Sequence, residues 1–149
     1  MATTTTTIGS GAATTELTTG GIFKGAAIGA GAGAVGNALL FFIGSAAGVP
    51  MVAEFAKGQP DAALGIGQVI GASFVPAIVA ALFTLLLNKL SSRPSRILVG
   101  VALAFGLFSM MGPATVLGAG TGLRVILALM HVVSGVAISG GILRFARRP

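Results

Sequence analysis

Residues 25–48 read GAAIGAGAGAVGNALLFFIGSAAG and contain no ionisable side chain. The uncharged run is longer than this stretch, since it extends from Lys24 to Glu54. An α-helix needs about 20 consecutive apolar residues to cross the hydrocarbon core of a bilayer. The run therefore predicts one membrane-spanning helix, which we place over residues 25–49.

Three more uncharged runs of similar length follow along the chain. Ionisable residues bound each of them: Asp61 and Lys89, Arg96 and Arg124, and Arg124 and Arg144, with His131 inside the last run. Each run is long enough for one span, and we expect these spans at residues 63–87, 97–117 and 123–143. The sequence thus predicts an all-α fold: a polytopic membrane protein whose four-helix transmembrane bundle occupies residues 22–145.

The composition of the whole chain agrees with a membrane protein. Hydrophobic residues make up 54% of the 149 residues and charged residues only 8%, whereas a soluble domain carries about a quarter charged residues. The formal net charge of +6 does not indicate nucleic-acid binding, because the basic residues stand at the ends of apolar runs and form no patch with aromatic residues. We expect the lipid bilayer as the partner, and no nucleic acid.

Basic residues gather on one side of the predicted bundle. This side has Lys24, Lys89, Arg93, Arg96, Arg144, Arg147 and Arg148. Only Lys57 and Arg124 belong to the opposite side, together with Glu54 and Asp61. Connections rich in Lys and Arg stay on the cytoplasmic side of a membrane. We therefore expect N-in, C-in topology, with residues 146–149 as a basic cytoplasmic tail.

The first 21 residues are rich in Thr, Ala and Gly and show no apolar periodicity. Such a segment buries too little apolar surface to offset its ordering entropy, so we expect a disordered cytoplasmic tail at residues 1–21. The alternative is a cleaved signal peptide with Ile43–Gly48 as its cleavage site. The apolar stretch is longer than the hydrophobic part of a signal peptide and lacks a compact basic start, which favours the tail.

Glycines recur at steps of three and four residues in the first two spans, a spacing that puts them on one helix face. They are Gly25, Gly29, Gly33 and Gly36 in the first span, and Gly67 and Gly71 in the second. Helices approach closely in membranes where side chains are small. We interpret these glycines as helix-packing positions within the bundle, with a dimer contact as the alternative. Pro76 and Pro113 should each kink or break a helix.

A few polar side chains lie inside the apolar runs and form the candidate site. The stretch RVILALMHVV, residues 124–133, contains Arg124 and, about 10 Å further along a helix, the only histidine, His131. Arg124 is either an interfacial anchor or a partner of the outer carboxylates. Asn37 and Gln68 are the other deep amides. A cluster of Asn37, Gln68 and His131, with Arg124, would serve either helix packing or a small polar cavity.

Catalytic chemistry has little support in this sequence. The chain has one His, no Cys and no paired carboxylates within the spans, so we assign no catalytic, cofactor-binding or metal-binding residues and expect no enzyme. The first functional hypothesis is a non-enzymatic membrane protein that acts through helix packing as an accessory or scaffold subunit, in a homo-oligomer or larger membrane complex. The alternative is a small oligomeric transporter or channel lined by Asn37, Gln68 and His131.

The spans and loop charges, together with the segment LRVILALMHVVSGVAI at residues 123–138, resemble an uncharacterised family of small bacterial four-span integral membrane proteins, a domain of unknown function. The likeness covers about residues 24–145. It implies the four-helix fold and a multi-pass location in the bacterial inner (plasma) membrane. It implies no activity, so Arg124 and His131 receive no role from it.

Overall fold

The computed structural model describes residues 17–147 except 56 and 59. Its helices are α1 (Thr19–Ala46), α2 (Ile66–Leu90), α3 (Pro94–Ser109), α4 (Met111–Thr115) and α5 (Thr121–Ala146), and its strands are β1 (Val52–Ala53) and β2 (Ala62–Ala63). With α3 and α4 taken together, four helices are long and apolar enough to cross a membrane. This confirms the predicted all-α, four-span fold. The N-in, C-in orientation stays a prediction.

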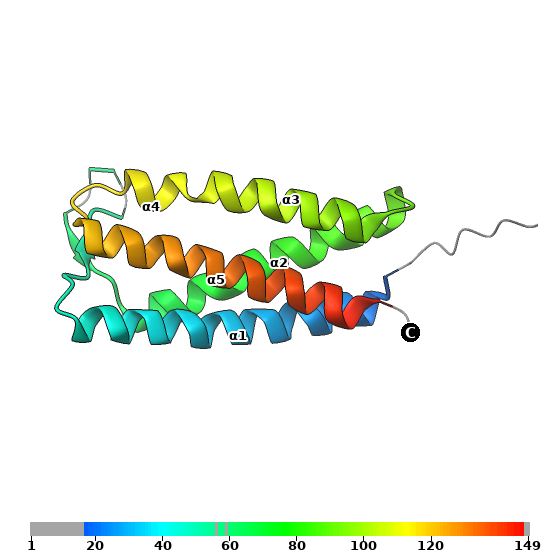
Figure 1. Ribbon diagram of the computed structural model, residues 1–149, viewed down its shortest axis with the longest axis horizontal. Helices are drawn as coiled ribbons and strands as arrows, with labels where there is room; N and C mark the ends of the chain where they lie inside the picture. Colours follow the sequence, from blue (N-terminus) through cyan, green and yellow to red (C-terminus); the bar gives the residue numbers. More distant parts are fainter. Residues whose placement is uncertain (1–16, 56, 59, 148–149) are drawn as a thin grey trace, which may run out of the picture.

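The helices form an elongated bundle in which α5 lies between α1 and α3, while α2 crosses behind them (Figure 1). Helix α1 packs most extensively against α5 and next most against α2. Helix α3 makes far fewer contacts with either α5 or α2. The bundle therefore has a tight unit of three helices, to which α3 adds a more loosely packed fourth.

All four helices continue past the predicted spans at the end of the bundle where the described chain begins and ends, because hydropathy marks only the hydrocarbon-crossing part of a helix. Helix α1 begins at Thr19 rather than at residue 25, and the Thr18 side chain accepts a hydrogen bond from the N–H of Gly21 (3.2 Å). The Leu17 side chain is buried. The predicted disordered tail 1–21 is thus corrected for residues 17–21, which are folded, and residues 1–16 lie outside the described residues.

At the opposite end three spans are shorter than predicted, and α1 ends at Ala46 instead of residue 49. Helix α2 runs over 66–90 instead of 63–87, and the third span over 94–115 instead of 97–117. Helix α5 extends to Ala146 instead of ending at residue 143, so the basic tail expected from residue 146 starts at the end of a helix. Residues 148–149 lie outside the described residues.

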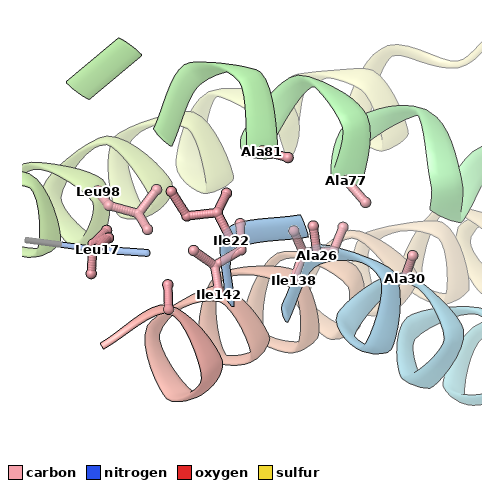
Figure 2. Packing of buried hydrophobic residues seen from close by; sticks show 10 residues of the cluster. Leu17, Ile22, Ala26, Ala30, Ala77, Ala81, Leu98, Ile138 and Ile142 are labelled. Atoms are coloured by element: carbon pink, nitrogen blue, oxygen red, sulfur yellow. The ribbon is translucent and has the colours of Figure 1, made fainter. Parts of the chain in front are cut away.

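The largest apolar cluster lies at the end of the bundle where the described chain begins and ends. Figure 2 shows the alanines of α2, Ala77 and Ala81, pointing towards Ala26 and Ala30 of α1. The larger members of this cluster are Leu17, Ile22, Leu98, Ile138 and Ile142. Small side chains between α1 and α2 let the two backbones approach closely, and the larger residues fill the end of the bundle.

Two prolines behave differently, although both were expected to disturb a helix. Helix α2 runs through Pro76 without a break. The third span is interrupted at Met110, which separates α3 from α4, and Pro113 follows within α4. Because proline has no N–H, Pro113 cannot continue the hydrogen-bond ladder to the preceding turn.

At the opposite end, a short antiparallel pair of strands closes the bundle. Val52 pairs with Ala63 and Ala53 with Ala62. The N–H of Glu54 also donates to the carbonyl of Leu117 (2.9 Å), which ties this hairpin to the connection between α4 and α5.

Candidate functional site

Asn37 forms the buried polar centre of the bundle. Its side chain is only 5% exposed, and its Nδ2 donates to Ser73 Oγ of α2 (3.0 Å) and to Ser134 Oγ of α5 (2.8 Å). Ser73 in turn donates to the carbonyl of Val69 (3.2 Å). Asn37 Oδ1 is buried and has no partner among the described residues. Asn37 thus joins three helices through one amide group.

Gln68 does not take part in this centre. It lies exposed in the first turn of α2, where its Oε1 accepts a hydrogen bond from the N–H of Gly65 (2.8 Å). The first N–H groups of a helix have no partner within the helix. The Gln68 side chain supplies an acceptor for one such group, the N–H of Gly65. Its role is that of a helix cap.

His131 is also apart from Asn37. Its Nδ1 lies 2.8 Å from the carbonyl oxygen of Leu127, one turn earlier in α5. A carbonyl only accepts, so Nδ1 carries the proton in this contact and donates it. The His131 side chain is exposed on the outer surface of the bundle. The predicted cluster of Asn37, Gln68 and His131 is therefore wrong, because the three side chains face different surroundings.

Ser73 and Ser134, the partners of Asn37, were not predicted from the sequence. Serine in a membrane helix often bonds back to its own preceding turn, as Ser73 does here to Val69. A serine in the sequence therefore gives no sign of which neighbouring helix it also contacts. The sequence holds no signal that distinguishes Ser134 from the other serines, because its contact with Asn37 depends on how α1 packs against α5.

Arg124 lies near the start of α5 and binds backbone carbonyls. Its Nε donates to Ala119 O (3.1 Å), Nη1 to Ala114 O (3.2 Å) and Nη2 to Val116 O (3.1 Å). The acceptors belong to the end of α4 and the connection that follows it. The expected ion pair with Glu54 or Asp61 is not formed, since the guanidinium caps a helix C-terminus, where carbonyls lack partners. The role of Arg124 as an interfacial anchor stays a prediction.

The predicted glycines fall into two groups. On α1, a Cβ at Gly25 would clash with the carbonyl oxygen of Gly141, and a Cβ at Gly29 would lie 2.5 Å from the carbonyl oxygen of Ala137. One at Gly36 would lie 2.7 Å from Val133 Cγ1, and one at Gly33 would fit at 3.5 Å from Ser134 Cα. All four face α5.

On α2, a Cβ at Gly67 or Gly71 would meet nothing within 4 Å. Both residues are exposed, so their expected role in packing within the bundle is not what the structure shows. Two further glycines of α1 also face α5 closely: a Cβ at Gly21 would clash with the Phe145 carbonyl, and one at Gly44 with the Ile126 side chain.

Comparison with known proteins gives one match. The model of a family of unknown function, DUF6069, matches residues 17–148. No curated protein and no solved structure matches the chain. The matched range includes every described helix, from the Thr18 cap of α1 to the end of α5. The chain therefore belongs to the family of unknown function DUF6069.

Proposed function

We propose that this protein is a non-enzymatic, multi-pass protein of the inner (plasma) membrane that acts through helix packing, as an accessory or scaffold subunit. The observation that carries this proposal is the unpartnered outer surface of α3. Only Pro94 and Leu98, both at the start of α3, are buried. Helix α3 is thus held by its beginning, while its middle is free to contact another protein.

The outer surface of α3 combines large and small residues on one helical face. This face contains Gly100, Leu103, Ala104 and Leu107. Leu103 is 66% and Leu107 77% exposed, and a Cβ at Gly100 would meet nothing within 4 Å. Small residues four apart let a second helix approach closely, and neighbouring leucines then pack around it. These features support α3 as the helix that contacts a partner.

The transporter or channel stays as an alternative because of one observation. Asn37 Oδ1 is a buried acceptor without a partner in the described chain, and a transported water or small polar solute could supply the missing donor. Against this alternative, Gln68 and His131 do not line a common path with Asn37.

Site-specific photo-crosslinking in native membranes tests the proposal. A photoreactive residue at Leu103 or Leu107 of α3 should give a discrete protein adduct of fixed mass. The matched controls are Val35 and Leu39, which are exposed on α1 to a similar extent. An adduct with twice the mass of the chain would indicate a homo-oligomer. An adduct with a different fixed mass would indicate a larger complex with another protein. Adducts with lipid alone at α3 would contradict the proposal.

The alternative has its own test, for which the absence of cysteine from the chain is an advantage. Cysteine in place of Ser73 or Ser134 should be protected from a membrane-impermeant thiol reagent if the bundle is dry. Labelling at both positions in intact cells would show that water reaches Asn37, and the transport hypothesis would then replace the first one.

A further inference from the structure

The basic residues of the described chain are concentrated at one end of the bundle. At this end, α1 and α5 are linked by the hydrogen bond from Thr18 N–H to the Ala146 carbonyl (2.8 Å), and α2 is linked to Leu17 through Asn88. The connection from α2 to α3 lies at the same end (Figure 1). The exposed cations here are Lys24, Lys89, Arg93, Arg96, Arg144 and Arg147.

Acidic side chains do not balance these cations within the described chain. Glu54 and Asp61 belong to the hairpin at the opposite end. The third acidic residue, Glu16, lies outside the described residues. Each of the nine Lys and Arg residues is a potential anion-binding group, but Arg124, at the far end, already holds three carbonyls. The excess of exposed positive charge therefore lies at the end of the bundle where the described chain begins and ends.

An apolar groove runs along the outer surface between α1 and α2 near this end. Its floor consists of Ala26, Ala30, Ala77 and Ala81, and its sides of Phe23, Ala27, Phe74 and Ile78. The groove has a volume of about 200 Å³ and is open on one side. Figure 2 shows the four floor alanines facing each other across the two helices. The groove extends from Phe23 to Ala30, about 10 Å along α1.

The groove leads towards a basic residue. Lys89 lies about three turns beyond Ile78 on α2, which places both residues on the same face of that helix. Leu85 lies between them on this face. A molecule with an apolar chain in the groove would therefore have its other end near Lys89, at the depth where lipid headgroups lie.

We propose that this groove binds an anionic phospholipid, with one acyl chain against the alanine floor and the phosphate headgroup at Lys89. Charge complementarity favours this occupant, because the groove is apolar over its length and leads towards the basic end of the bundle. A zwitterionic lipid would fill the groove equally well but would gain less from the basic end. A helix of another protein would need an acidic residue at the level of Lys89 to match the same features.

The test uses the full chain reconstituted in phosphatidylcholine vesicles that contain a trace of spin-labelled phosphatidylglycerol or spin-labelled phosphatidylcholine. Electron paramagnetic resonance reports the fraction of each labelled lipid that the protein immobilises. Phosphatidylglycerol should be preferred. Lys89→Gln should lower this preference about fivefold, the factor expected for one basic side chain near an anionic headgroup. Salt should weaken the preference, because ions screen exposed charges.

Two matched pairs of variants separate this site from a general attraction of lipid to a positive protein. Lys57→Gln removes one exposed cation at the opposite end and should leave the preference unchanged. Ala27→Phe blocks the groove from an exposed position and should abolish immobilisation of the preferred lipid, whereas Ala32→Phe, also exposed on α1 but outside the groove, should not. Circular dichroism checks that all four variants keep their helix content.

Several results would overturn the proposal. One is equal immobilisation of both lipids by the unmodified chain. Another is an equal effect of Lys89→Gln and Lys57→Gln, which would mean that only net charge matters. A third is an Ala27→Phe variant that keeps its lipid preference but lowers the protein mass measured by light scattering, which would show that the groove holds a helix of a second copy.

Discussion

At the scale of single residues, the sequence indicates which side chains are unusual but not what they bind. Arg124 stands out because a cation begins an apolar run, yet its three acceptors are backbone carbonyls. Every residue carries such a carbonyl, so no pattern of side chains could have indicated them. Asn37 was likewise recognised as a deep amide, but its partners are two serines on other helices. The contact of Asn37 with these serines depends on how the three helices pack, which the sequence does not indicate.

The Arg124 contacts lead to a stability prediction. Arg124→Gln removes a charged fork that holds the end of α4, so we expect a loss of about 1–2 kcal/mol in the free energy of unfolding, from charged hydrogen bonds that are partly open to solvent. Arg124→Lys should recover only part of this loss, because an ammonium group lacks the planar fork. Thermal unfolding in detergent, followed by circular dichroism, measures both. The control is Lys57→Gln, and equal melting temperatures for the two Gln variants would contradict the prediction.

At the scale of helices, the four uncharged runs were sufficient to predict all four spans, since the hydrocarbon thickness sets a length that few other structures require. The bounds were less predictable, because Thr18 and Leu17 continue the folded chain into a polar sequence. Glycine spacing identified the face of α1 that meets α5, but the same spacing on α2 marks a face without a neighbour. A row of small residues shows where a helix could approach, and only the packing shows whether one does.

This difference between α1 and α2 makes a matched pair of glycine substitutions informative. Gly29→Ala would put a Cβ 2.5 Å from the Ala137 carbonyl oxygen and 2.6 Å from Ile138 Cα. Both atoms are backbone and cannot rotate away, so we expect α1 and α5 to separate, with a loss of about 1–3 kcal/mol in stability. The Cβ that Gly67→Ala adds would meet no atom within 4 Å. This variant should therefore raise stability by up to about 1 kcal/mol, because alanine has the higher helix propensity. Equal melting temperatures for the two variants would show that α1 and α5 do not pack as described.

At the scale of the whole molecule, helix order and the meeting of the chain's described ends could not be read from the sequence. Hydropathy gives four equivalent cylinders, and many arrangements of four cylinders bury similar areas. In the structure, α1 is the helix that packs extensively against both α5 and α2. The basic connection from α2 to α3 and the basic helix ends lie together at one end of the bundle (Figure 1), and Glu54 and Asp61 belong to the hairpin at the other end.

This asymmetry of charge along the bundle predicts the orientation in the membrane. The basic end, which includes Ser92 in the connection from α2 to α3, should be cytoplasmic, and the end with Thr121 should face outward. In intact cells, a membrane-impermeant thiol reagent should label Thr121→Cys and should reach Ser92→Cys only after the membrane is permeabilised. Both positions are exposed, so access and not burial decides the labelling. The reverse pattern would leave the four-span fold intact but would place the anionic-lipid site in the outer leaflet, where the headgroup argument would have to be tested against the lipids of that side.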